Sequence, residues 1–480
     1  MKLYELLEEL QTTLPDCEIT GVTDDSRKVS AGSVFVCIKG AKFDGHSVAA
    51  EMLANGAVCV ICERNLGLGE QQIVVENTRK TYGDLCAAWY GHPERKMRFV
   101  GVTGTNGKTT TATLIQQMLK AAGHRVGLIG TTQYEIRDEI LPSVNTTPLT
   151  DAYFSLLQKM VDAHCDIVVM EVSSFGLEQY RIGPTQFEVA IFTNLTQDHL
   201  DIHGNMENYY QAKKMLFSRC KYAIVNGNDE YGKRLFSEIS CEKCSYGLLD
   251  ADAMMLSVAA KDPILCADGT AFTLYIGNEA IPVQLRMIGL FNVSNVTAAV
   301  AACQKMGVQM DTMLRLLADY AGVRGRCEVI PTGRDFTVIC DYAHTPDAIE
   351  KILSSLKACT NGRIIALFGC GGNRDAAKRP KMAKAAAKYA DLLMITSDNP
   401  RDENPLQIMA EILTGLEDSK VPYIAEPDRA EAIFLAMQQA EAGDVIVLCG
   451  KGHEDYQIIE GGVKLHMDER ELVAEGLKRL

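Results

Sequence analysis

A glycine-rich segment carries the strongest chemical signal in the chain. The apolar run Phe99–Thr103 is followed by Gly104-Thr105-Asn106-Gly107-Lys108-Thr109-Thr110 and then by a helical pattern. Glycines let backbone N–H groups approach phosphate oxygens, and a helix N-terminus adds partial positive charge. Lys108 would reach the β- and γ-phosphates, and Thr109 would offer its hydroxyl to Mg²⁺. We therefore predict a phosphate-binding loop. The alternative is a glycine-rich turn with an exposed lysine, since Val102 stands where the strict pattern requires glycine.

Polar side chains follow two further apolar runs. Glu171 comes directly after Ile167–Met170, and His199 lies a few residues after Val189–Phe192. In parallel sheets the carboxyl ends of the strands line the ligand crevice, and a carboxylate there suits Mg²⁺. Two alternatives stay open: Glu171 as a solvent-exposed strand-end residue, and His199 as a structural hydrogen-bonding group.

A helix is predicted after these runs. The pattern Tyr209–Phe217 is amphipathic and contains two adjacent lysines, Lys213 and Lys214. Lysines in such a helix ordinarily form a solvated face. From the pattern alone, we expect both lysines to be exposed.

The rest of the chain supplies the elements that would position these residues. Short β-branched runs alternate with longer helical patterns, which is typical of an α/β fold with parallel sheets. Polar breaks near residues 91–98 and 322–326 predict three domains, 1–97, 98–325 and 326–480. We further predict strands at Ser33–Ile38 and Ala57–Ile61 with a helix between them, a strand at Tyr222–Val225, helices at 290–306 and Met310–Ala321, and four C-terminal strand-and-loop units, TVICDYAHTPD, RIIALFGCGGNRD, DLLMITSDNPRDENP and DVIVLCGKGHEDYQ.

Composition limits the class of protein. A length of 480 residues, with 47% apolar and 23% charged residues, fits a globular protein of about three domains. The net charge of −14 disfavours duplex nucleic acid and anionic membranes as partners, and at first sight a strongly anionic substrate as well. No run reaches about 18 apolar residues and the first residues do not resemble a signal peptide, so we expect no membrane insertion.

The 16 cysteines are scattered through apolar segments, as free thiols are in a reducing compartment. We therefore expect a cytoplasmic protein. Cys59 and Cys62 lie in a strand-like run and are expected in the core. Cys241 and Cys244 could form half of a zinc site, but no second pair lies at the usual spacing.

An ordered set of motifs extends over nearly the whole chain. It comprises TGTNGKTT, EVSS, NLTQDHLD, YYQAKKMLF, GRCE, DYAHTPD, GGNRD, DNPR and GKGHEDYQ. In this order the set resembles the Mur ligases, ATP-dependent amide ligases of peptidoglycan precursor synthesis. The resemblance implies an α/β fold of three domains: an N-terminal α/β UDP-binding domain, a central P-loop ATPase-like domain with a mostly parallel sheet, and a C-terminal Rossmann-like domain.

The resemblance also implies a reaction. The box Asp398-Asn399-Pro400-Arg401 is similar to that of family members that take meso-2,6-diaminopimelate. They join it to the D-Glu γ-carboxyl of UDP-MurNAc-L-Ala-D-Glu. ATP phosphorylates the carboxyl to an acyl phosphate, the amine displaces phosphate, and ADP is left. Arg401 would grip the distal carboxylate in a bidentate fork, which lysine as substrate does not offer.

Residues that match the family's motifs take roles that the resemblance implies. ATP and Mg²⁺ are the expected small-molecule partners besides the two substrates. The implied catalytic residues are Lys108, Lys213 and, as a candidate proton acceptor, His344, for which a hydrogen-bonding role in its loop is the alternative. The loop 104–110, Asn292, Arg326 and Asp341 would hold ATP. The UDP-sugar dipeptide would be held by Ser26, Asn145, Thr146, Thr147, Ser173, Gln179 and Arg181. Diaminopimelate would be held by Arg374, Asp398, Asn399, Pro400, Arg401, Gly450 and Glu454. Mg²⁺ would be bound by Thr109, Glu171, His199 and Lys213, the last as N6-carboxylysine.

Other functional interpretations of these motifs stay open. A sibling ligase that adds L-lysine or D-Ala-D-Ala, or a folylpolyglutamate synthase, would share many of these motifs. A P-loop phosphotransferase and a non-catalytic UDP-sugar binder are more distant alternatives. Phe175 stands where the family usually has histidine, so we expect substrate positioning to differ there. We expect a monomer whose C-terminal domain closes on the ATP site.

Overall fold

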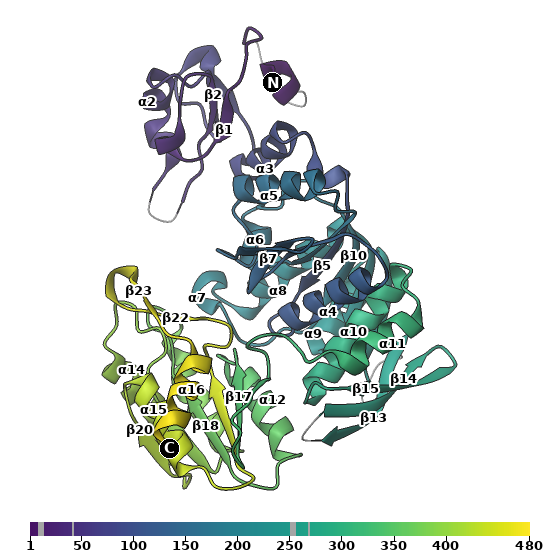
Figure 1. Ribbon diagram of the computed structural model, residues 1–480. Coiled ribbons are helices and arrows are strands. Elements are labelled where there is room, and N and C mark those ends of the chain that lie inside the picture. Colours follow the sequence, from purple (N-terminus) through teal and green to yellow (C-terminus); the bar gives the residue numbers. More distant parts are fainter. Residues whose placement is uncertain (8–13, 41–42, 250–255, 267–268) are drawn as a thin grey trace. The chain divides into compact units, whose positions relative to one another are not determined.

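The computed structural model describes residues 1–7, 14–40, 43–249, 256–266 and 269–480 (Figure 1). The chain forms two compact units. The first comprises Met1–Thr103, Gly123–Ala190 and Ala212–Tyr222, and the second comprises Gly104–Ala122, Ile191–Gln211 and Ala223–Leu480. Strands β10 (Phe187–Phe192) and β11 (Cys220–Asn226) contribute residues to both units.

A four-stranded parallel sheet opens the first unit. Its strands lie in chain order, β1-β2-β3-β4, and its core packs α2 against the sheet through Phe35, Met52 and Val60. The two strands and the intervening helix predicted here are confirmed. The elements are α1 (Leu3–Leu6), β1 (Gly21–Thr23), β2 (Ser33–Val36), α2 (Ala49–Ala54), β3 (Cys59–Cys62), β4 (Gln72–Val74) and α3 (Thr78–Trp89), with 3₁₀ turns at Ser26–Lys28, Gly45–Val48, Gly69–Gln71 and Pro93–Arg95.

A second run of strands in the first unit has the order β10-β5-β9-β6-β7-β8. β9 pairs in parallel with both β5 and β6, so that Val169 lies between Val100 and Leu128. These strands are buried on both faces, which explains their near-continuous apolar runs. The antiparallel pairs β6–β7 and β7–β8 were not predicted. The elements are β5 (Arg98–Thr103), β6 (Val126–Ile129), β7 (Gln133–Ile136), β8 (Glu139–Pro142), α5 (Thr150–Asp162), β9 (Ile167–Glu171) and α6 (Ser174–Glu178).

The second unit holds strands in the order β11-β12-β13-β14-β15. β12 and β13 are parallel, whereas β13, β14 and β15 form an antiparallel meander beside α10 and α11 (Figure 1). α10 and α11 both pack against α4, and they confirm the two predicted helices. The elements are α4 (Lys108–Ala121), α7 (Leu200–His203), α8 (Met206–Lys214), α9 (Glu230–Glu238), β12 (Glu242–Leu248), β13 (Val258–Cys266), β14 (Gly269–Ile276), β15 (Glu279–Leu285), α10 (Leu290–Lys305) and α11 (Met310–Asp319). The end of α8 and the 3₁₀ turn Met215–Arg219 that follows it belong to the first unit.

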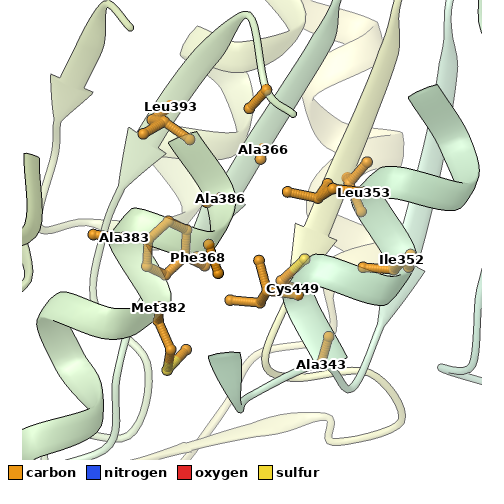
Figure 2. Close-up of a cluster of buried hydrophobic side chains, with 14 of the residues drawn as sticks. Ala343, Ile352, Leu353, Ala366, Phe368, Met382, Ala383, Ala386, Leu393 and Cys449 are labelled. Atoms are coloured by element: carbon orange, nitrogen blue, oxygen red, sulfur yellow. The ribbon is translucent and has the colours of Figure 1, made fainter. Parts of the chain in front are cut away.

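A six-stranded sheet follows in the same unit, in the order β16-β17-β21-β18-β19-β20. All of its pairs are parallel except β16–β17. Figure 2 shows the core on one face, where Phe368 of β18 lies among Leu353 of α12 and Met382 and Ala383 of α13. The opposite face packs against α15 and α16. The elements are β16 (Glu328–Ile330), β17 (Thr337–Asp341), α12 (Pro346–Lys357), β18 (Ile364–Phe368), α13 (Arg379–Ala387), β19 (Leu392–Ile395), α14 (Pro405–Leu413), β20 (Tyr423–Ala425), α15 (Arg429–Gln439), β21 (Val445–Cys449), β22 (Tyr456–Ile458), β23 (Lys464–His466) and α16 (Glu469–Arg479), with 3₁₀ turns at Ala376–Lys378, Thr414–Leu416 and Glu460–Gly462.

The α/β class and the four C-terminal strand-and-loop units are thus confirmed. Helices lie on both faces of the last sheet, as in a doubly wound fold. The antiparallel pairs lie beside parallel ones in the same sheets, which agrees with the expectation of a mostly parallel sheet. The domain boundaries near 97 and 325 stay predictions. Within the described ranges, no helix is long and apolar enough to cross a membrane.

Candidate active site

The phosphate loop has a backbone that only glycine adopts easily at two positions. Gly104 and Gly107 have φ values of +150° and +86°. A Cβ atom at Gly104 would collide with the hydroxyl of Thr193, and one at Gly107 with the side-chain amide of Asn295. Gly107 is the N-cap of α4, so the loop delivers its backbone directly into a helix N-terminus. The predicted strand-loop-helix order and its glycine requirement are therefore present.

The loop that follows β10 holds the phosphate loop in place. Asn194 accepts the Thr105 N–H at its carbonyl (2.8 Å) and the Asn106 N–H at its side chain (2.9 Å). The Thr193 hydroxyl donates to the Asn106 carbonyl at 2.6 Å. The Thr196 N–H donates to the Thr105 hydroxyl at 3.0 Å. These bonds fix the loop's shape before any nucleotide is bound.

Lys108 contacts neutral carbonyl oxygens, whereas Thr109 contacts a guanidinium. The Lys108 ammonium donates to the carbonyls of Gly104 (3.0 Å) and Thr105 (2.9 Å). Arg326 donates to the Thr109 hydroxyl at 3.0 Å. Thr110 is buried in the first turn of α4. The structure therefore brings the predicted ATP residue Arg326 to the phosphate loop.

The remaining predicted ATP residues lie close by. Asn292 is buried at the start of α10, where its side chain donates to the Ile288 carbonyl (2.9 Å) and accepts from Asn295 (3.3 Å). Asp341 ends β17 and accepts the N–H groups of Cys327 (2.6 Å) and Ala343 (2.7 Å). Burial raises the pKa of Asp341, against the opposing charge of Arg326 and those two N–H groups.

His344 has one ring nitrogen engaged. Its Nδ1 lies 2.8 Å from the Tyr342 carbonyl, which can only accept, so Nδ1 carries the proton. The lone pair of the neutral ring is then at Nε2, which lies 3.8 Å from the Asp198 carboxylate. Burial, followed by the charge of Lys378, lowers the pKa of His344. A neutral imidazole with Nε2 open to protonation is the form a proton acceptor requires.

One side of the predicted amino-acid site holds two carboxylates beside a buried lysine. The buried Lys451 donates to Asn399 and to Glu454, both at 2.8 Å. Asn399 in turn donates to Glu454 at 3.0 Å. The carboxylate of Asp398 lies 3.8 Å from Lys451, and a Cβ at Gly450 would press on it at 2.7 Å. Burial would raise the pKa of Asp398, but Lys451 and Arg429 hold it below its usual value.

Two arginines form the cationic side of the same site. Arg401, with φ at +52°, donates to the carbonyl of Gly372 at 2.9 Å. Arg374 is exposed and donates to the Asn373 carbonyl at 3.3 Å. Burial, followed by the like charge of Arg374, lowers the pKa of Arg401. The carbonyl oxygen of Pro400 packs so closely against Gly372 that a Cβ at Gly372 would collide with it.

A network of hydroxyls and one carboxylate lies in the first unit. Glu171 is 1% exposed and accepts the N–H (2.8 Å) and hydroxyl (2.9 Å) of Thr131, whose hydroxyl also contacts that of Thr146 at 3.0 Å. Thr147 contacts the Ser173 hydroxyl at 3.1 Å. Of the two alternatives for Glu171, the solvent-exposed one is therefore wrong.

The same network carries a guanidinium. Arg181 donates to the Thr147 carbonyl at 3.0 Å, and its guanidinium lies 4.9 Å from the ring centre of Phe175. Burial, followed by the charge of Arg79, lowers the pKa of Arg181. Asn145 is joined to Tyr134 through its backbone (3.1 Å), and Gln179 is the C-cap of α6.

Ser26 lies in the four-stranded part of the first unit. It begins a 3₁₀ turn that is capped by Asp25, whose carboxylate accepts the Arg27 N–H at 3.1 Å. Residues 41–42 of this part of the chain lie outside the described residues.

The predicted metal residues lie in both units. Thr109 and His199 belong to the second unit, Glu171 and Lys213 to the first. His199 has φ at +53°, caps α7 and lies 3.4 Å from Asp198. Lys213 is only 2% exposed, so its expected solvated position is wrong. Within the first unit, the Glu171 carboxylate offers oxygen donors that suit a hard cation, and a carbamate on Lys213 would add oxygen donors where an ammonium would repel the metal.

Two buried arginines that the motifs did not reveal hold the C-terminal loops. Arg429 pairs with Glu469 at 2.6 Å and also donates to the carbonyls of Ser397 and Cys449. Arg379 pairs with Glu403 (2.8 Å) and Glu411 (2.7 Å). An arginine at a helix start, followed by apolar residues at helical spacing, was the only available signal.

Comparisons with known proteins identify the family of the chain. Three family models match the chain: "Mur ligase family, catalytic domain" at residues 18–90, "Mur ligase middle domain" at 102–303 and "Mur ligase, glutamate ligase domain" at 325–452. The chain is 41% identical to the UDP-N-acetylmuramoyl-L-alanyl-D-glutamate--2,6-diaminopimelate ligase of Bacillus cereus, over 96% of this chain and 94% of that protein. It is also 41% identical to the Syntrophomonas wolfei protein of the same name, over 100% and 99%.

Solved structures give the same result. A structure of a UDP-N-acetylmuramoyl-L-alanyl-D-glutamate--2,6-diaminopimelate ligase matches with a TM-score of 0.71 and 31% identity, covering 100% of this chain and 99% of that chain. MurF from Acinetobacter baumannii matches with a TM-score of 0.63 at 20% identity, over 99% and 98%, which shows a shared fold. The three-domain α/β architecture is therefore confirmed.

Proposed function

The chain belongs to the Mur ligase family, and on that premise we propose its reaction: ATP-dependent formation of an amide between meso-2,6-diaminopimelate and the D-Glu γ-carboxyl of UDP-MurNAc-L-Ala-D-Glu. The products are ADP, phosphate and the tripeptide-bearing nucleotide sugar. The observation that carries this choice of substrate is the polarity of the amino-acid site. Arg374 and Arg401 form its cationic side, and Asp398 and Glu454 its anionic side.

This polarity suits an amino acid with charges at both ends. The distal carboxylate of diaminopimelate would be bound by the Arg401 fork, and its distal ammonium by Glu454. L-Lysine has the ammonium but lacks the distal carboxylate, so it would leave a half-buried guanidinium without an anion. The site therefore favours diaminopimelate over the substrate of the sibling ligase.

ATP activates the carboxyl because oxide is too poor a leaving group. Two anions brought to about 4 Å repel each other by roughly 4 kcal/mol at an effective dielectric of 20. Lys108 would offset this repulsion by moving from the carbonyls of Gly104 and Thr105 to the γ-phosphate. Arg326, which donates to the Thr109 hydroxyl, would turn to contact the bound nucleotide instead. The family resemblance assigns Thr109, Glu171, His199 and a carbamylated Lys213 to Mg²⁺, which would supply further positive charge at the phosphates.

The incoming amine has to lose a proton. We assign this proton to Nε2 of His344, whose Nδ1 is already committed to the Tyr342 carbonyl. Asp198, 3.8 Å from Nε2, would stabilise the imidazolium that forms. Replacing His344 with glutamine should lower kcat, and the acidic limb of the pH–rate profile should disappear with it.

The UDP-sugar dipeptide would lie along the first unit's network. Arg181, Ser173, Gln179 and the Asn145-Thr146-Thr147 turn offer donors for its carboxylates and amides, and Ser26 offers a donor for its UDP moiety. We infer a monomeric, cytoplasmic enzyme. Sedimentation of the purified protein with all three substrates tests its oligomeric state.

Lys213 is proposed to be N6-carboxylysine. Burial of an ammonium is costly, whereas a carbamate is an anionic oxygen ligand for the metal. Lys213→Ala should lose activity and regain part of it with short-chain carboxylates. Lys214→Ala is the matched control and should keep full activity. Full activity of Lys213→Ala without rescue would remove this residue from the mechanism.

An amino-acid panel tests the function itself. Purified protein with ATP, Mg²⁺ and UDP-MurNAc-L-Ala-D-Glu is offered meso-diaminopimelate, L-lysine or D-Ala-D-Ala, and phosphate release is measured together with product mass. We expect a product only with diaminopimelate. Stimulation by L-lysine instead would identify the sibling ligase, and phosphate release without any amide would identify a phosphohydrolase.

A further inference from the structure

A short hairpin in the second unit has no role in the reaction proposed above. Strands β22 and β23 pair antiparallel, and β22 holds Gln457, the last residue of the motif GKGHEDYQ. A two-stranded hairpin alone is marginally stable, so its bonds to the rest of the chain decide where it lies. Several of these bonds, and of those from the turn that follows β22, end on the segment 397–402, which contains the box 398–401. The hairpin therefore supports the proposed diaminopimelate site.

The box lies in a connecting segment, between the end of β19 at Ile395 and the start of α14 at Pro405. Such a segment depends on bonds from other parts of the chain to fix its backbone. Arg401 needs them in particular, because its φ of +52° is a left-handed conformation that costs a non-glycine residue free energy. The direction of its guanidinium follows from this backbone. The bonds that hold the box therefore also aim the guanidinium fork.

The backbone of the hairpin holds the second half of the box. The Arg401 N–H donates to the Ile458 carbonyl at 3.0 Å, and the Ile458 N–H donates to the Asn399 side-chain oxygen at 2.8 Å. One residue of the hairpin thus holds two residues of the box, as a neighbouring strand would. Just beyond the box, the Gly461 N–H donates to the Asp402 carboxylate at 3.1 Å. The left-handed turn at Arg401 is therefore held from both sides.

The Gln457 side chain holds the start of the box. Its amide donates to the Asp398 carbonyl at 2.6 Å and to the Ser397 hydroxyl at 3.3 Å. Gln457 directly precedes Ile458, so two neighbouring residues of the hairpin fix the box at both ends. The Asp398 carboxylate is held separately, 3.8 Å from Lys451. Loss of the Gln457 amide would therefore release the backbone of the box at one end without removing any of its charged partners.

We propose that Gln457 is a positioning residue that aims Arg401 at the distal carboxylate of the amino-acid substrate. Its amide anchors the box at Asp398, and Ile458 extends that anchor along the hairpin to the Arg401 N–H. A fork that is fixed before the substrate arrives binds a carboxylate without the entropy cost of being ordered. The inference rests on the function proposed above, because it takes Arg401 as the group that binds this carboxylate.

Steady-state kinetics of Gln457→Met test the proposal, since methionine has a similar length but no N–H donor. We expect KM for diaminopimelate to rise about 3- to 15-fold, as the net loss of one hydrogen bond predicts, with KM for ATP and kcat unchanged. The melting temperature should fall by at most about 4 °C. Gln438→Met is the matched control, because it makes the same change at an exposed position of α15, and it should alter none of these values. If Gln457→Met melts earlier than this, Gln457→Asn serves, since its shorter amide stays polar but stops short of the Asp398 carbonyl.

A double-mutant cycle with Arg401→Lys separates positioning from a general structural effect. If Gln457 acts through Arg401, Gln457→Met should raise KM for diaminopimelate much less in the Arg401→Lys background than in the unaltered chain. Additive effects would overturn the proposal, and so would an unchanged KM for diaminopimelate or an equal rise of KM for ATP. If the unaltered chain made no amide from diaminopimelate, the proposed function would fail and this inference with it. The other results bear on Gln457 alone and leave that function standing.

Discussion

Replacing Glu469 with glutamine tests how the amino-acid loops are held. Glu469 and Arg429 both have side chains that are 0% exposed, and they pair through contacts of 2.9 and 2.6 Å. Arg429 also donates to the carbonyls of Ser397 (3.1 Å) and Cys449 (2.8 Å). These carbonyls directly precede Asp398 and Gly450, two residues of the proposed diaminopimelate site.

The expected loss follows from the burial. Removing one partner leaves an uncompensated buried charge, which costs about 3–5 kcal/mol. For a cooperative unit of about 150–250 residues each kcal/mol lowers the melting temperature by about 2–4 °C, so the Glu469→Gln variant should melt about 6–20 °C earlier. Because Arg429 would release the two loop carbonyls, KM for diaminopimelate should rise more than KM for ATP.

Calorimetric melting and steady-state kinetics measure both effects. Lys357→Met is the control, since it breaks an exposed pair with Asp391 (2.7 Å) and should cost at most about 1 kcal/mol. Arg429→Met/Glu469→Leu should recover part of the stability, because it removes both charges. A Glu469→Gln protein as stable as the control would refute the reasoning.

Three further predictions concern single residues. The pKa of His453 is lowered to about 3 by burial and then by Arg326, Arg470, Arg324 and Lys451. The unfolded chain therefore takes up a proton below about pH 6.5 that the folded chain refuses, and stability should fall by up to about 1.4 kcal/mol per pH unit as the pH drops from 6.5 toward 3. His453→Gln should flatten urea-unfolding profiles measured over that range, and parallel profiles would contradict this. Phe175→Leu removes the ring face from Arg181 and should raise KM for the UDP-sugar dipeptide about two- to fivefold at unchanged kcat. Phe175→Tyr should not, and equal KM values for the two variants would rule out this role for the ring. Arg401→Lys keeps the charge but loses the fork, so KM for diaminopimelate should rise about 10- to 150-fold. An unchanged KM would remove Arg401 from the site.

The strands that carry the site were predictable because they are buried on both faces. β5, β9 and β21 read as short apolar runs that end in polar or glycine-rich loops, and such runs have few alternative structures. The meander β13–β15 was not predictable. Pro263 and Pro282 interrupt its strands, and a register shift between Lys261 and Ile264 breaks the alternation that marks a strand.

The burial of Lys213 was predictable in principle. Tyr209, Lys213 and Leu216 follow helical spacing, and all three are buried, so Lys213 lies on the apolar face of α8. The adjacent Lys214 hid this signal, because two lysines together suggest a solvated face. By contrast, the pair Arg429–Glu469 joins residues 40 positions apart on two helices, and no local pattern connects them.

The net charge of −14 does not exclude anionic substrates, because cations in the scaffold and cations in the site have different partners. Scaffold cations such as Arg379, Arg429 and Lys451 are held by carboxylates. Site cations are held by neutral oxygens: Arg181 by Thr147, Arg326 by Thr109 and Arg401 by Gly372. In the described parts of the chain, none of these three site arginines forms an ion pair. A neutral acceptor fixes the direction of a guanidinium but leaves its charge available, so each of them can still bind a phosphate or carboxylate. The partner of a cation, rather than the total charge of the chain, therefore indicates where an acidic protein can bind anions.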